Sequence, residues 1–121
     1  MDKNLFLPLA AIWYDKIKSG EKTTEYRELK PYWMKRLNVK SVNILGKKNS
    51  DGPERRPASI NWNSGLWPDF VIFSRGYTSE RICFEISGVS VVPGINSDLK
   101  IDAPVFAIKL GKRIYEYEKN C

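Results

Sequence analysis

The stretch Ile17–Glu28 reads IKSGEKTTEYRE and carries the features that decide the fold. The segment Leu9–Ser19 overlaps the start of this stretch. Its apolar side chains recur at the spacing of one face of a helix. Gly20 follows directly and is suited to end that helix in a left-handed conformation. Because Lys22–Glu28 is rich in strand formers, we expect a strand immediately after the cap.

Short strands dominate the rest of the predicted structure. A first strand is expected over Asn4–Leu7, closed by Pro8 because proline cannot donate to a sheet ladder. A second short helix is expected over Pro31–Leu37, with proline in its first turn. Further strands are predicted from alternation and β-forming residues at Val39–Leu45, Asp69–Ser74, Arg81–Ser87 and Val105–Leu110. Strands at short intervals with two early helices predict an α+β fold, a small and mostly antiparallel β-barrel, as a single domain over residues 1–121.

Three segments are less regular in sequence. Gly46–Pro57 is turn-rich, with a hairpin turn expected at Asp51-Gly52, and the stretch from there to Trp67 fits either a hairpin arm or a long loop. Gly88–Pro104 is expected to be irregular, and the RIYEYE stretch after Gly111 is expected to continue as strand.

Composition and charge narrow the classes of function. The chain has 121 residues, 42% of them hydrophobic, and a formal net charge of +6. An excess of basic residues favours anionic partners, of which nucleic acid is the commonest. A cationic surface that only keeps the protein in solution explains the charge about equally well. The absence of histidine removes the usual general base and the usual metal ligand, so we expect neither a metal nor a cofactor. Cys83 and Cys121 fit free thiols, and no apolar stretch reaches membrane-spanning length, so we expect a soluble cytoplasmic protein without membrane partners.

Several motifs resemble one known family. The pattern LPL…GxKxxEYR…PYW within Leu7–Leu37 resembles the N-terminal signature of the ASCH domain family. The FSRGY stretch at Phe73–Tyr77, the RICFEISG stretch at Arg81–Gly88 and the closing strand at Val105–Gly111 resemble later parts of the same branch. The resemblance implies a PUA-like β-barrel with a basic cleft beside the GxKxxxxR strand. It also implies binding of RNA or nucleotides, with some members resembling acetylcytidine amidohydrolases and some linked to RNA cleavage.

The resemblance carries particular residues into that cleft. By motif position these are Lys22 and Arg27, together with Glu85 on a later strand. Amidohydrolase members place a threonine nucleophile where this chain has Glu25. The segment therefore favours ligand binding over that named reaction.

The residues themselves add further candidates. Arginine and lysine can hold phosphates, and aromatic side chains beside them can stack on bases. The candidate ligand-binding residues are Lys22, Arg27, Tyr32, Arg36, Arg75 and Tyr77. If the chain is an enzyme, the candidate acid/base residues are Lys22, Glu25 and Glu85. Two of these residues have a structural alternative, Lys22 as a solvated strand-end lysine and Glu85 as an exposed face residue. Trp13, an aromatic residue near the motif at helical spacing, is expected to be a core side chain.

Three functions remain open at this point. The leading hypothesis is a domain that binds RNA or a nucleotide-like ligand. The alternatives are a hydrolase acting on a modified nucleoside amide or on RNA, and a module that binds other proteins.

Overall fold

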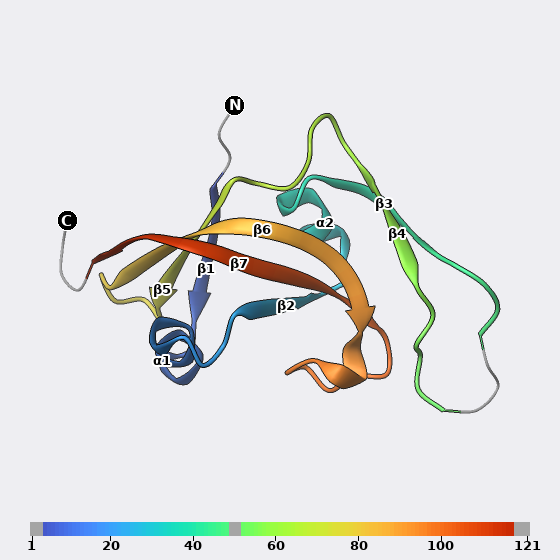
Figure 1. The fold of residues 1–121 in the computed structure, drawn as a ribbon, viewed down its shortest axis with the longest axis horizontal. Helices are drawn as coiled ribbons and strands as arrows, with labels where there is room; N and C mark the ends of the chain where they lie inside the picture. The colour runs from blue at the N-terminus through green and yellow to red at the C-terminus, as the bar shows by residue number, and fades with distance from the viewer. Residues whose placement is uncertain (1–3, 49–51, 118–121) are drawn as a thin grey trace. The chain divides into compact units, whose positions relative to one another are not determined.

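A computed structural model describes residues 4–48 and 52–117 (Figure 1). Its helices are α1 (Ala11–Ser19) and α2 (Pro31–Arg36), with a short 3-10 turn at Gly94–Asn96. Its strands are β1 (Asn4–Leu9), β2 (Thr24–Glu28), β3 (Val39–Ile44), β4 (Ala58–Trp62), β5 (Phe70–Arg75), β6 (Arg81–Pro93) and β7 (Pro104–Tyr117). The predicted α+β class, mostly strands with two short helices early in the chain, is confirmed.

The strands of the described residues form a five-stranded sheet and a two-stranded sheet. The larger sheet has the order β1-β5-β6-β7-β2, with β1 parallel to β5 and β5 antiparallel to β6. The smaller sheet pairs β3 with β4 in antiparallel register, from Val39 opposite Trp62 to Ile44 opposite Ala58. Of the two alternatives for the stretch up to Trp67, the hairpin arm is therefore the correct one, while the expected turn residue Asp51 lies outside the described ranges.

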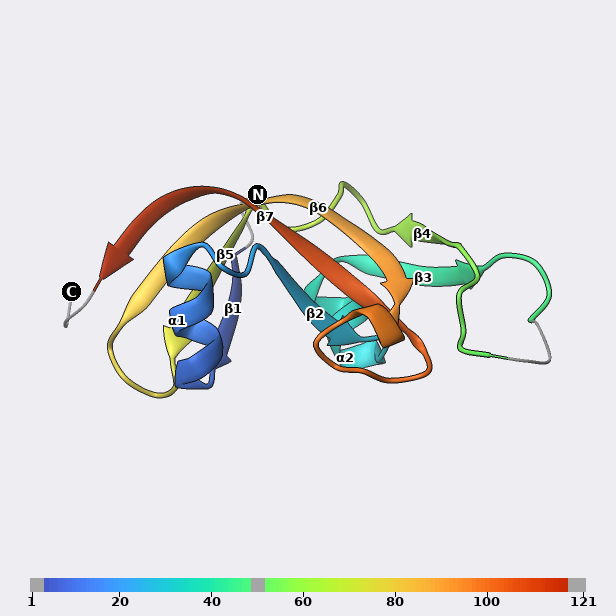
Figure 2. The same ribbon diagram turned by 60° about the horizontal axis from the view of Figure 1, so that its bottom comes forward.

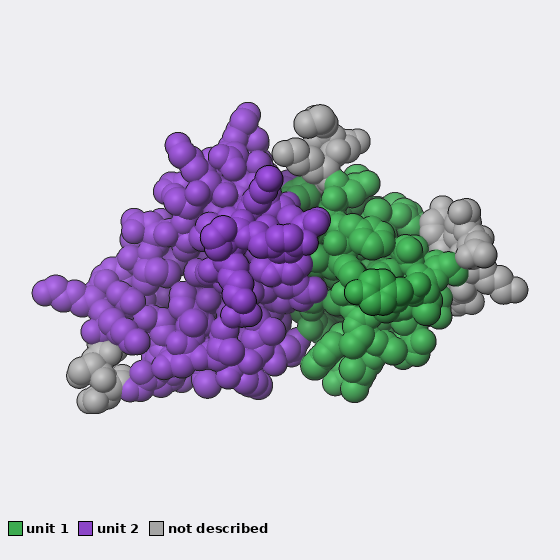
Figure 3. Space-filling model, turned by 180° about the vertical axis from the view of Figure 1, so that it is seen from behind, with its two compact units in different colours: residues 1–25, 68–87, 109–121 green, residues 26–67, 88–108 purple. Residues whose placement is uncertain are grey.

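The contacts divide the chain into two compact units, coloured separately in Figure 3. Unit 1 comprises residues 1–25, 68–87 and 109–121, and unit 2 comprises residues 26–67 and 88–108. Strands β2, β6 and β7 begin in one unit and end in the other. Each unit buries apolar side chains of its own.

Unit 1 is built around the parallel β1–β5 pair with α1 beside both strands, as Figures 1 and 2 show. Strand β1 alternates exposed and buried residues, which buries the three leucines at positions 5, 7 and 9. Tyr14 and Ile17 of α1 are each 1% exposed, whereas Ile12 is exposed. The core of this unit is completed by Val71, Phe73, Ile82, Phe84 and Ile86.

Unit 2 has a separate apolar cluster. Leu37 ends α2 and is fully buried, and Val39 opens β3 beside it. Residues 105–108 of β7 and Val89 of β6 are the other buried apolar residues described in this unit.

Three predicted element boundaries were wrong for identifiable reasons. Strand β1 runs through Pro8 to Leu9 because β1 is an edge strand of the sheet, where a missing N–H is tolerated. Strand β6 continues through Gly88 to Pro93, in a region expected to be irregular. Strand β2 begins at Thr24, so Lys22 precedes the strand and does not belong to it. The continuation of the last strand past Gly111 is confirmed.

Candidate ligand-binding site

Lys22 and Glu25 form a buried ion pair in unit 1. The Lys22 Nζ lies 2.8 Å from the Glu25 Oε1, and the two side chains are only 11% and 4% exposed. In a continuous strand, residues three apart would point to opposite faces. The pair can form because Lys22 lies in the irregular stretch before β2, where its backbone N–H donates to the Lys16 carbonyl at 3.0 Å. The alternative that Lys22 is a solvated strand-end lysine is therefore wrong.

Gly20 sets the geometry of this stretch. It adopts φ 86°, and its N–H donates to the Ile17 carbonyl, as a left-handed helix cap does. The cap turns the chain back along α1, so that the Lys22 ammonium lies 4.7 Å from the centroid of the Trp13 ring. Lys16 approaches the same ring at 5.2 Å and also pairs with Glu21 at 3.4 Å. Trp13 is half-buried and contacts two cations, a role that helical spacing alone did not predict.

In unit 2 a second group of cations and aromatic rings lies on and beside α2, which we call the α2 array: Arg27, Trp33, Tyr32 and Arg36. The guanidinium of Arg27 lies 5.1 Å from the centroid of the Trp33 ring. Trp33 meets Tyr32 edge to face, with centroids 4.7 Å apart. Arg36 lies 4.8 Å from the Tyr32 centroid. Two adjacent rings thus lie between two cations, in the order Arg27, Trp33, Tyr32, Arg36.

The α2 array follows from local sequence. Lys30 is extended, Pro31 occupies the first helical turn, and Lys35 and Arg36 lie in the last turn, where positive charge suits the helix dipole. Adjacent helical positions point about 100° apart, which lets Tyr32 and Trp33 meet edge to face. Tyr32 is 57% exposed, so its ring keeps accessible surface despite these contacts.

Arg75 and Tyr77 lie at the end of β5 in unit 1. Arg75 forms a bidentate ion pair with Asp15 of α1, with Nε–Oδ1 at 3.1 Å and Nη2–Oδ2 at 3.3 Å. These hydrogen bonds hold the pKa of Asp15 below its usual value and raise the pKa of Arg75. Gly76 turns the chain with φ 58°, and Tyr77 is fully exposed. Arg75 therefore links the end of β5 to α1, which is a structural role separate from its candidate role in binding an anion.

Glu85 lies on the exposed face of β6, opposite Phe70 of β5. Its side chain makes no ion pair with any residue in the described ranges. Of the three candidate acid/base residues, the structure thus joins Lys22 and Glu25 in a direct contact.

The ligand-binding candidates are brought together only in part. The structure joins Arg27, Tyr32 and Arg36 through Trp33, which was not among the residues selected from the sequence. The PYW motif close to Arg27 was the signal that marked it. Lys22, Arg75 and Tyr77 belong to unit 1 and take no part in this group.

Within residues 4–48 and 52–117, no group of three or more Cys, Asp or Glu side chains could hold a metal ion. No helix in the same ranges is long and apolar enough to cross a membrane.

Comparisons with known proteins returned no match, whether with family models, curated proteins or solved structures.

Proposed function

We propose that this chain is an RNA- or nucleotide-binding domain of the ASCH type, with a PUA-like β-barrel fold. The sequence motifs around residues 20–33 and the formal charge of +6 support the proposal. The single observation that carries it is the α2 array, in which two adjacent aromatic rings lie between two cations.

The chemistry of the α2 array matches a single-stranded nucleic acid. Every base has a π-face, so base–aromatic stacking is tolerant of sequence and is worth about 1–3 kcal/mol per base. The exposed Tyr32 ring offers such a face, while Arg27 and Arg36 at the two ends of the array are placed to attract phosphates. A nucleotide or a short RNA segment supplies both groups in one molecule.

Substitutions at Tyr32 test this proposal. Tyr32→Ala is expected to weaken binding of a fluorescein-labelled single-stranded RNA about 5- to 150-fold, since it removes one stacking ring. Tyr32→Phe keeps the ring and loses only the hydroxyl, so it should bind like the unmodified chain. Fluorescence anisotropy at several salt concentrations measures both, with unlabelled mononucleotide as competitor. Equal affinities for Tyr32→Ala and Tyr32→Phe, or no binding at low salt, would contradict the proposal.

A hydrolase is the second candidate, and the buried Lys22–Glu25 pair favours it. A lysine and a carboxylate 2.8 Å apart are within reach for proton transfer. Their shielding from water strengthens any electrostatic effect on a bound group. Release of acetate from acetylcytidine by the purified chain supports this candidate, whereas binding without release leaves the domain as a binding module.

A further inference from the structure

Beyond the last paired residues of β3 and β4, in unit 2, lies a small pocket. It has a volume of about 240 Å³ and is lined by Lys48, Pro53, Glu54, Arg55, Arg56 and Pro57. Pockets for drug-sized ligands measure about 300–1,000 Å³, so this one suits a smaller group.

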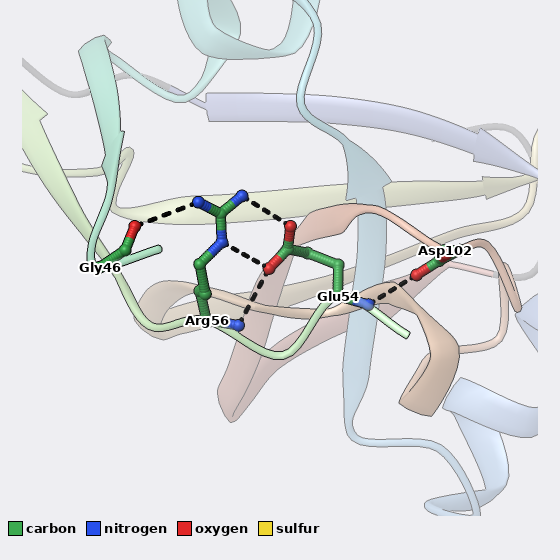
Figure 4. Close-up of polar contacts among 4 residues, drawn as sticks. All are labelled: Gly46, Glu54, Arg56 and Asp102. Carbon is green, nitrogen blue, oxygen red and sulfur yellow. Dashed lines mark hydrogen bonds and ion pairs between the residues drawn. The ribbon is translucent and has the colours of Figure 1, made fainter. Parts of the chain in front are cut away.

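Hydrogen bonds join the two described sides of the arm next to the pocket. The Leu45 N–H donates to the Pro57 carbonyl at 2.9 Å, which continues the β3–β4 pairing past its last strand residues. The Arg56 Nη1 donates to the Gly46 carbonyl at 3.2 Å, so that one side of the loop is held to the other (Figure 4). Two prolines among the lining residues further restrict the backbone.

Glu54 fixes the guanidinium of Arg56. Its carboxylate accepts from the Arg56 Nε at 2.8 Å and Nη2 at 2.7 Å, and from the Arg56 backbone N–H at 3.1 Å. These bonds lower the pKa of Glu54 to about 2, so it stays ionised at neutral pH. On the side of Glu54 away from Arg56, the Glu54 N–H donates to the Asp102 Oδ1 at 2.6 Å (Figure 4). The position of Arg56 is thus set before any ligand arrives.

The described residues that line the pocket carry an excess of two positive charges. Lys48, Arg55 and Arg56 supply three, and Glu54 offsets one. Neither Lys48 nor Arg55 forms an ion pair with another residue in the described ranges, and both are exposed. Arg56 uses three of its five side-chain N–H groups on Glu54 and Gly46, so two N–H groups have no partner within residues 4–48 and 52–117.

We propose that this pocket, defined by Lys48, Arg55 and Arg56, binds a phosphate group. Two exposed cations and one fixed guanidinium around a small hollow match the charge and the acceptor oxygens of a phosphate. The phosphate can belong to a free small molecule or to a polynucleotide, because both present the same oxygens. The pocket shares no side chain with the α2 array and does not depend on the function proposed for that array.

Titration with inorganic phosphate tests the pocket directly. Backbone amide and arginine Nε–H signals of ¹⁵N-labelled protein are followed at constant ionic strength, with chloride replacing phosphate in the control titration. We expect saturable shifts at residues 54–56 with phosphate. The double variant Lys48→Gln/Arg55→Gln should weaken the phosphate Kd at least about tenfold, since it removes two charged contacts. Lys40→Gln, on the same arm but outside the pocket, is the matched control and should keep the original Kd.

Two results would overturn the proposal. One is a linear response that chloride reproduces, and the other is an equal loss of phosphate affinity in the double variant and in Lys40→Gln. Because Lys48 and Arg55 are exposed and make no ion pair within the described ranges, neither replacement should disturb folding, and an unchanged thermal midpoint verifies this.

A competition experiment identifies the source of the phosphate. If the phosphate belongs to RNA, inorganic phosphate should displace labelled RNA from the unmodified chain and the double variant should bind that RNA more weakly. If it belongs to a free small molecule, the RNA affinity should be the same in both proteins. Loss of RNA binding in Tyr32→Ala with intact phosphate shifts would separate the α2 array from this pocket.

Discussion

The oppositely charged side chains of Lys22 and Glu25 are almost fully shielded from water, and this burial costs desolvation energy for each charge. Their attraction at 2.8 Å offsets that cost only while both partners are present. The Trp13 ring beside Lys22 adds a cation–π contact that a neutral side chain would lose. The pair therefore has a larger effect on stability when broken than when replaced as a whole.

The chain offers a matched comparison for this effect. Lys30 pairs with Glu28 at 3.3 Å, but these side chains are 59% and 48% exposed. Lys22→Met should lower the free energy of unfolding by about 3–5 kcal/mol because it leaves the buried Glu25 without this partner. Lys30→Met should change it by about 0–1 kcal/mol. Urea unfolding measures both.

A double variant separates the pair from the packing around it. Lys22→Met/Glu25→Met removes both charges and should recover much of the stability lost in Lys22→Met. A loss in Lys22→Met no greater than in Lys30→Met would show that burial does not raise the cost of breaking the pair.

For the helices and strands, the boundaries that depend on local chemistry could be predicted from the sequence. The end of α1 at Gly20 and the start of α2 at Pro31 were predicted because a left-handed cap and a first-turn proline are local signals. The passage of β1 through Pro8 was not predictable, since whether proline is tolerated depends on which strand lies at the sheet edge. The continuation of β6 through Gly88 likewise depends on neighbouring strands rather than on local propensity.

The residues of the candidate site, like the element boundaries, could be predicted only in part. Lys22 and Arg27 were selected by motif, and Tyr32, selected as a ligand-binding candidate, is 57% exposed. The roles of Trp13 and Trp33 were not predicted because the sequence pattern around a half-buried tryptophan is the same as around a core one. Which cation lies over which ring is set by the tertiary structure.

Three glycines are expected to respond differently to the same substitution. Gly20 has φ 86° but open space where a methyl group would lie, so Gly20→Ala should cost about 1–2 kcal/mol through backbone strain alone. At Gly94 the added Cβ would lie 2.2 Å from the Ala103 carbonyl oxygen, so Gly94→Ala must displace backbone and should cost more. Gly88 has neither obstacle, and Gly88→Ala should be neutral or stabilising by about 0.4–1 kcal/mol.

Thermal unfolding of the three glycine variants checks this order. Gly94→Ala should have the lowest midpoint, Gly20→Ala an intermediate one, and Gly88→Ala a midpoint at or above that of the unmodified chain. An unperturbed Gly94→Ala would show that the 94–103 segment can separate without cost.

Across the chain as a whole, the pH dependence of stability follows from which groups titrate. The chain has no histidine, and burial raises the pKa of the Cys83 thiol, which keeps it protonated at neutral pH. Few side chains therefore change charge between about pH 5.5 and 8. In acid, by contrast, Asp15 and Glu54 lose the hydrogen bonds that Arg75 and Arg56 donate to their carboxylates.

The sign of the acid effect is fixed by the direction of these pKa shifts. Both carboxyl groups have pKa values below their usual 3.8 and 4.5, and that of Glu54 falls to about 2. Their contribution to stability is complete above those usual values and is lost as the pH falls through the folded-state values. The thermal midpoint should thus be nearly constant from about pH 8 to 5.5 and should decline from about pH 4.5 to 2. Arg56→Gln should make the acid decline shallower, because Glu54 would then titrate near its usual pKa in both states. A midpoint that changes most between about pH 5.5 and 8, or an acid decline unaltered by Arg56→Gln, would contradict this assignment.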